Sequence, residues 1–131
     1  MDDTPPTIPP ESADLLRLLA DPTRREIFLL IVQGEICNCE IAETLDIAQN
    51  LVSHHLGKLR HAGLIDMHRD PLDARWTHCT VNLETLTRAW EGLETVLHPS
   101  HVGTRIPACR VHAKRGTATR AAELSGKGTL R

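Results

Sequence analysis

Large aromatic residues are nearly absent from this chain of 131 residues, which has no tyrosine, one phenylalanine and two tryptophans. A hydrophobic core must therefore be built mainly from aliphatic side chains. No apolar run approaches the roughly 18 residues that a membrane span requires. The acidic, proline-rich segment from Met1 to Pro6 lacks the basic and apolar regions of a signal peptide. We therefore expect a cytoplasmic protein with one domain and tails.

Cysteine is scarce as well, with four residues in the chain. Disulfides are rare in the cytosol, so the cysteines are interpreted as thiols for metal or redox chemistry. The chain has no Cys-x-x-Cys spacing in a βαβ context, no glycine-rich phosphate loop and no paired acid–base residues. We therefore do not expect an enzyme.

The net charge of −2 hides an uneven distribution of charge. From residue 104 onward the chain has seven basic residues and one acid, so residues 1–103 hold 8 bases and 16 acids, a net of −8. An acidic body binds DNA poorly without local positive charge. Any contact with DNA must then come from a local basic patch.

Proline and glycine mark the boundaries of the domain. Residues 1–11 contain four prolines and are expected to form a flexible lead-in. Residues 12–98 are expected to form the folded domain. Residues 99–131, which are basic and carry Cys109, are expected to form a flexible tail.

Two helices are predicted before residue 35. The first is expected to be capped by Ser12. The second starts at Asp21-Pro22, an N-cap followed by proline at the first helical position, and ends at Gly34. Arg24 and Arg25 lie in its first turn, where the helix dipole disfavours cations. This placement points either to an external anion such as phosphate or to an ordinary solvated face.

A short helix capped by Asn38 and a second helix over residues 49–62 follow, joined by a turn of three or four residues. Leu51 and Val52 are expected to face inward, and Gly63 ends the second helix. This is the spacing of a helix-turn-helix motif.

Two strands, at residues 64–69 and 75–81, are predicted on either side of a turn at residues 70–74. A hairpin directly after a helix-turn-helix is a wing. A last helix capped by Asn82 has apolar residues at 3-4-3-4 spacing, typical of a seam that pairs with another helix: Leu83, Leu86, Trp90, Leu93 and Leu97. The fold class is mainly α with a small β-hairpin, a dimeric winged helix-turn-helix with five helices.

The exposed face of the 49–61 helix and the tip of the wing carry the residues suited to double-stranded DNA. Glutamine and asparagine pair with adenine edges, whereas lysine and arginine contact phosphates. The alternative is an ordinary solvated helix face. The predicted contacts are Gln49, Asn50, Ser53, His54, Lys58, Arg60, Arg69 and Arg75. His55 is expected to point inward.

Two motifs resemble the arsenical and metal-responsive winged-helix repressors of the ArsR/SmtB family. They are the run from Leu19 to Arg25 and the run from Val52 to Ile65, and the resemblance extends over about residues 13–97. It implies a homodimer through the first and last helices, and repression of an operon by the ligand-free protein. The family usually has Ser or Thr at position 48, where this chain has Ala48, so either Asp46 caps the second helix or its first turn is looser.

The segment from Glu35 to Ile41 resembles the Cys-x-Cys box of the arsenite-sensing branch. This resemblance implies that Cys37 and Cys39 bind As(III) or Sb(III), usually with a third sulfur, and that binding releases the protein from DNA. Side chains at i and i+2 do not face the same way on a helix. We therefore expect ligation to bend or unwind the first turn. In isolation, both cysteines would be interpreted as small buried residues.

Cys109 is the expected third sulfur, because the tail offers a purely structural cysteine no core to join. Cys79 alternates with Thr77 and Val81 and is expected to pack in the core. The family's other metal site, for zinc, is expected to be absent, although His98 and His101 match half of its spacing. Two alternatives remain for the thiol pair: a redox or persulfide switch, or a sensor of a soft divalent metal such as Cd(II) or Pb(II).

Overall fold

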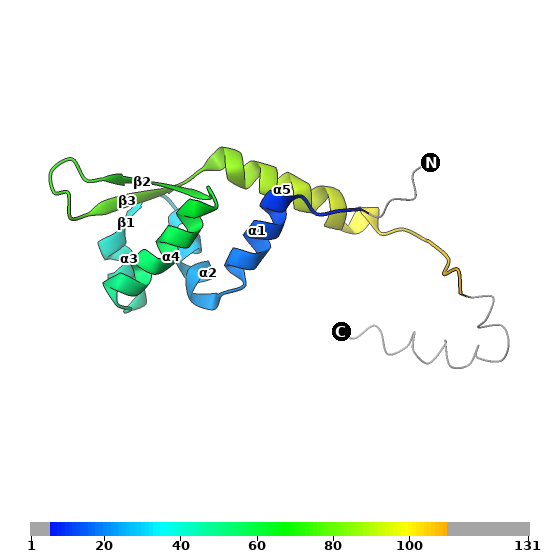
Figure 1. Ribbon diagram of the computed structural model, residues 1–131, viewed down its shortest axis with the longest axis horizontal. Coiled ribbons are helices and arrows are strands. Elements are labelled where there is room, and N and C mark those ends of the chain that lie inside the picture. The colour runs from blue at the N-terminus through cyan, green and yellow to red at the C-terminus, as the bar shows by residue number, and fades with distance from the viewer. Residues whose placement is uncertain (1–5, 110–131) are drawn as a thin grey trace. The chain divides into compact units, whose positions relative to one another are not determined.

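The computed structural model describes residues 6–109 of the chain. Residues up to His101 belong to one compact unit, and the chain from Val102 onward belongs to a second. In chain order the elements are α1 (Pro10–Leu19), α2 (Pro22–Val32), β1 (Ile36–Cys37), α3 (Asn38–Leu45), α4 (Gln49–His61), β2 (Ile65–Arg69), β3 (Thr77–Val81), α5 (Leu83–Leu97) and a 3₁₀ helix, η1 (Pro99–His101). The predicted winged helix-turn-helix architecture of five helices with a hairpin is confirmed (Figure 1).

Helices α1 and α5 lie side by side, and small residues allow their close approach (Figure 1). The hydroxyl of Ser12 is fully buried and donates to the Ala89 carbonyl at 2.7 Å. A Cβ atom at Gly92 would overlap Ser12 Oγ and lie 2.9 Å from Pro9 Cγ. The expectation that Ser12 caps the first helix was therefore wrong. The helix begins three residues earlier than a cap at Ser12 would place it, because Pro10 supplies a first helical residue with fixed φ.

The sheet has three antiparallel strands in the order β1-β3-β2. The two predicted strands are present, and β1 adds a third that pairs Ile36 with Cys79 and Cys37 with His78. A strand of two residues is too short to show alternation in the sequence, so the prediction missed it. In Figure 1 the β2–β3 hairpin extends away from the α1–α5 pair, with α3 and α4 beside it.

The turn between α3 and α4 runs through Asp46, which adopts the left-handed conformation (φ 53°) and ends α3. Helix α4 then starts from Ala48 without a side-chain cap, so Asp46 does not cap it. Its first turn is closed by backbone hydrogen bonds of 3.1 Å from the Leu51 and Val52 amides to the Ala48 carbonyl, so it is not looser. Leu51 was expected to face inward, but 39% of its surface is exposed. The inward face of α4 centres on Val52 and Leu56, and Leu51 lies one step around the helix from it.

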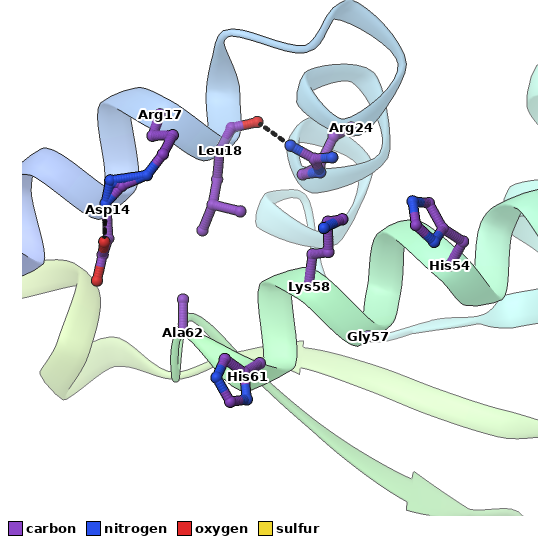
Figure 2. A pocket seen from close by; sticks show the side chains of 9 residues that line it. All are labelled: Asp14, Arg17, Leu18, Arg24, His54, Gly57, Lys58, His61 and Ala62. Carbon is purple, nitrogen blue, oxygen red and sulfur yellow. Dashed lines mark hydrogen bonds and ion pairs between the residues drawn. The ribbon is translucent and has the colours of Figure 1, made fainter.

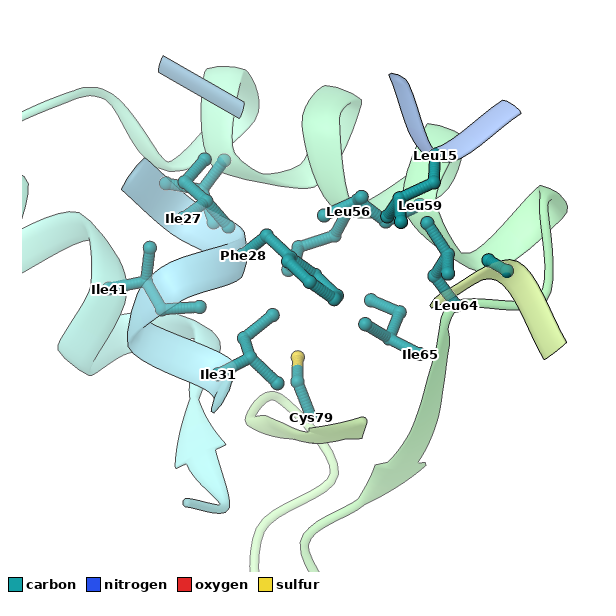
Figure 3. Close-up of a cluster of buried hydrophobic side chains, with 12 residues drawn as sticks. Leu15, Ile27, Phe28, Ile31, Ile41, Leu56, Leu59, Leu64, Ile65 and Cys79 are labelled. Carbon is teal, nitrogen blue, oxygen red and sulfur yellow. The ribbon is translucent and has the colours of Figure 1, made fainter. Parts of the chain in front are cut away.

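The core is aliphatic, as the composition predicted, and it joins α1, α2, α3, α4, the sheet and α5. Figure 3 shows Phe28 and Cys79 within the cluster of buried side chains. These are Leu15, Ile27, Phe28, Ile31, Ile41, Val52, Leu56, Leu59, Leu64, Ile65, Cys79 and Ala89. Within residues 6–109, no helix is long and apolar enough to cross a membrane.

Candidate metal centre and nucleic-acid interface

The thiol of Cys37 is the N-cap of α3. Cys37 has extended backbone angles (φ −82°, ψ 146°), and its sulfur accepts a hydrogen bond from the Cys39 amide at 3.3 Å. The Glu40 carboxylate in turn accepts from the Cys37 amide at 3.0 Å, which completes a capping box. Cysteine therefore takes the role that serine or threonine usually has at this position.

The sulfurs of Cys37 and Cys39 converge, 2.6 Å apart, while α3 is intact. The expectation that they meet only if the first turn bends or unwinds was therefore wrong. Cys37 lies just outside the helix in extended backbone, so the helical angle between positions i and i+2 does not separate the two side chains. A soft ion held about 2.3 Å from each sulfur in tetrahedral geometry, as zinc is, would place the sulfurs about 3.8 Å apart. Opening the pair by about 1 Å makes it fit such an ion.

Proton binding at the pair depends on the proximity of the two thiols. The hydrogen bond with Cys37 and partial burial together raise the pKa of Cys39 to about 11. A second negative charge beside the first is therefore disfavoured until a cation shares it. Binding of a divalent soft cation to this pair must release a proton, so its affinity should increase with pH.

Cys79 lies on the other side of β3 from the thiol pair. Its cross-strand neighbours are Ile36 and Met67, whereas Cys37 lies opposite His78, and successive side chains of a strand point to opposite faces. Cys79 is fully buried, and burial raises its pKa to about 11. Both observations agree with its interpretation as a packed core thiol.

Cys109 is exposed and belongs to the second unit. Over residues 6–109, the structure holds no group of three or more His, Cys, Asp and Glu side chains placed to bind a metal. The pair formed by Cys37 and Cys39 is thus a two-sulfur site within the first unit, and the assignment of Cys109 as third ligand stays a prediction.

A network of histidines and acids that the sequence analysis missed lies on the Cys37 face of the sheet. The Glu35 carboxylate is 3.4 Å from His68 Nε2 and 3.3 Å from His78 Nδ1, and the two rings stack. His78 Nε2 also contacts the Asp70 carboxylate at 2.8 Å. This contact raises the pKa of His78 and lowers that of Asp70. The network ties the segment before Cys37 to the wing near its tip. The alternation of β2 and β3 could have predicted the histidine pair, but not the Glu35 contact.

The predicted DNA-contacting residues of α4 all lie on its exposed surface. They are Gln49, Asn50, Ser53, His54, Lys58 and Arg60. His55, expected to point inward, is buried, and burial lowers its pKa, which favours the neutral ring. One helix face thus combines base-reading side chains with cations.

The two wing arginines flank the tip of the hairpin, as predicted, but both have protein partners. The Arg75 guanidinium donates three hydrogen bonds to the Asp73 carboxylate, at 2.7, 3.0 and 3.2 Å, and lies over the Trp76 ring. Arg69 donates to the Ala74 carbonyl at 3.2 Å. Asp73 neutralises part of the positive charge at the tip, so the wing offers a phosphate less attraction than its two arginines would suggest.

The fold and these two surfaces define a winged helix-turn-helix protein with a thiol pair at the start of the first helix of its motif. The model of the bacterial regulatory protein arsR family matches residues 21–67. An arsenic resistance transcriptional regulator of Pseudomonas putida is 33% identical over 85 residues, 64% of this chain and 71% of that protein. The chain belongs to the arsR family of bacterial regulatory proteins.

A second relative, the arsenical resistance operon repressor of Escherichia coli, is 40% identical over 65 residues, 49% of this chain and 53% of that protein. The chain thus spans about half the length of this and other curated relatives. Among solved structures, an ArsR-like transcriptional regulator from Rhodococcus has a TM-score of 0.56 at 20% identity, over 88% of this chain and 91% of that one. This last similarity shows the fold alone.

Proposed function

We propose that the protein is a DNA-binding transcriptional repressor of a metalloid-resistance operon, released from its operator when As(III) or Sb(III) binds cysteine thiolates. The observation that carries the proposal is the convergence of the Cys37 and Cys39 sulfurs at the N-cap of α3. Soft thiolate ligands select soft ions over hard ones. The names of the two bacterial relatives agree with arsenic as the ligand.

Release follows from the double role of the Cys37 sulfur. The sulfur accepts from the Cys39 amide in the absence of an ion. When it shares its lone pairs with an ion and moves away from Cys39, α3 loses its cap. Helix α3 packs on α4 and is joined to it by a three-residue turn. A shift of α3 therefore moves the DNA-contacting face of α4.

The proposal includes a homodimer through α1 and α5. Three members of the predicted seam of α5 are exposed in the single chain, with Trp90 at 59%, Leu97 at 58% and Leu83 at 72%. Leu16 of α1 is exposed as well. In a dimer that covers this apolar surface, the two copies of α4 would contact DNA half-sites about 34–36 Å apart, or a multiple of that distance.

A DNA-release assay tests the function. The operator is first selected by the protein from random duplexes, and release is then followed by fluorescence anisotropy under reducing conditions. We expect As(III) to release the DNA. Release by peroxide or polysulfide without release by As(III) would instead identify a redox or persulfide switch. A response to Cd(II) or Pb(II) alone would identify a sensor of soft divalent metals.

The same assay tests the third ligand. The variant Cys109→Ser should weaken the As(III) response more than Cys79→Ala does, because Cys79 faces the core. The opposite order would remove Cys109 from the site. Circular dichroism of both variants shows whether either change alters the fold.

A further inference from the structure

Two buried side-chain nitrogens within residues 6–109 have no hydrogen-bond partner, Arg24 Nε and His55 Nδ1. The two residues interact electrostatically, so both unpartnered groups lie in the same corner between α2 and α4. Arg24 is 9% exposed, and its Nη1 donates a hydrogen bond to the Leu18 carbonyl at 3.2 Å. A buried donor without a partner is costly, so it needs an explanation.

A pocket of about 730 Å³ opens beside Arg24, between the end of α1, the start of α2 and α4 (Figure 2). Its charged and polar lining consists of Asp14, Arg17, Arg24, His54, Lys58 and His61. Asp14 forms an ion pair with Arg17. Within the described part of the chain, Arg24 and Lys58 have no carboxylate in ion-pair contact, although Asp21 attracts Arg24 at longer range. The pocket is therefore cationic.

We propose that this pocket binds an oxyanion of the phosphate class, with Arg24 Nε–H and the Lys58 ammonium as its main donors. A guanidinium matches the geometry of phosphate oxygens, and a lysine adds a point charge. An anion would accept a hydrogen bond from the unpartnered Arg24 Nε and would also offset the excess positive charge of the pocket. Water could satisfy only the first of these needs.

The pocket has room for a group larger than inorganic phosphate, because its volume of about 730 Å³ is in the range of sites that hold whole small molecules. Two sources supply such a phosphate: the backbone of DNA bound at α4, or a free phosphorylated small molecule. His54 and Lys58 belong both to the pocket and to the proposed DNA-contacting face. The assignment of a DNA phosphate as the ligand therefore rests on the proposed function, whereas the assignment of an anion site does not.

The test is an NMR titration of the DNA-free protein with inorganic phosphate, with chloride at matched ionic strength as the control. We expect a saturable shift of the Arg24 Nε–H signal that chloride does not produce. The variants Arg24→Gln and Lys58→Gln should each lower the affinity for phosphate at least tenfold, which is the effect expected for a lost hydrogen bond to a charged group. Lys58 is exposed, so its variant keeps the test valid if Arg24→Gln fails to fold.

Arg25→Gln is the matched control, because Arg25 lies in the same turn of α2, is exposed and does not line the pocket. Phosphate affinity should not change in this variant. No phosphate shift beyond that of chloride, or an equal loss in Arg25→Gln and Lys58→Gln, would overturn the anion site.

A DNA experiment then identifies the source of the phosphate. Two results together would identify a backbone phosphate of DNA as the ligand. Bound operator prevents the chemical shift change caused by phosphate, and Lys58→Gln reduces the salt dependence of DNA affinity by the amount expected for about one phosphate contact. If operator-bound protein still binds phosphate, the ligand is a free phosphorylated molecule. A protein that binds no DNA would refute the proposed function and leave the result of the phosphate titration intact.

Discussion

Replacing Cys37 by serine separates the two roles assigned to its sulfur, as cap of α3 and as ligand. A serine hydroxyl is among the best N-cap groups and can accept from the Cys39 amide as the sulfur does. It is a poor ligand for a soft ion. We therefore expect Cys37→Ser to bind DNA and to lose its response to As(III). Alanine removes both roles, so Cys37→Ala should lose the response and stability together.

The difference in stability can be estimated from the loss of the cap. Removal of an N-cap side chain costs about 1 kcal/mol of folding free energy. For a domain of about 100 residues, 1 kcal/mol lowers Tm by about 4–8 °C. Cys37→Ala should therefore melt about 5 °C below the parent protein, whereas Cys37→Ser should melt at or above it. Cys39→Ser should leave Tm nearly unchanged, because the Cys39 sulfur does not cap the helix.

Thermal unfolding followed by far-ultraviolet circular dichroism, with and without As(III), measures both effects. As(III) should raise Tm of the parent protein only, since a ligand of the native state stabilises it by mass action. Equal Tm values for Cys37→Ser and Cys37→Ala would show that the Cys37 side chain does not cap α3. The mechanism of release through the cap would then be refuted, although the thiols could still be ligands.

Three further changes test the packing and electrostatics. Gly92→Ala should destabilise the fold by about 1–3 kcal/mol in denaturant titrations, because its methyl group overlaps Ser12 Oγ; Gly57→Ala, with open space at the site, is the control. Trp90→Glu should give a monomer in sedimentation analysis, and an unchanged dimer would exclude this face of α5 as the interface. Asp70→Asn should lower the pKa of His78 toward 6.5 in NMR titrations. The stability lost in Asp70→Asn should depend on pH. It should be largest between the lowered pKa of Asp70 and pH 6.5, where Asp70 and His78 are both charged, and smaller above the raised pKa of His78, where the ring is neutral.

The order of elements could be predicted because each long helix has a periodic apolar face and a local stop signal. Asp21-Pro22 at the start of α2 and Gly63 after α4 act through backbone conformation and capping, which depend on neighbouring residues only. The exposed face of α4 that is proposed to contact DNA follows from the same periodicity. Arg69 and Arg75 lie beside the hairpin loop, as predicted from the strand pattern.

The features that the sequence did not predict depend on contacts between distant segments. Strand β1 exists because β3 offers it an edge, and the hydroxyl of Ser12 is buried by a helix 77 positions away in sequence. The pocket beside Arg24 likewise depends on how α1, α2 and α4 meet. The pairing of Asp73 with Arg75 is local, but it depends on side-chain directions that the sequence does not give. The cations in the first turn of α2 left open an anion or a solvated face, and the sequence could not separate the buried Arg24 from its exposed neighbour Arg25.

In the proposed mechanism, the capping role of Cys37 explains how ion binding at one thiol pair acts on α4. Helix α3 has eight residues, too few to be stable without tertiary contacts. It is held by the buried Ile41, by the capping box at its start and by the left-handed Asp46 at its end. Helix α4 starts without a side-chain cap of its own, so its first turn depends on the turn that α3 supplies. Loss of one restraint at the start of α3 therefore acts on the least restrained end of α4, where Gln49 and Asn50 face the proposed operator.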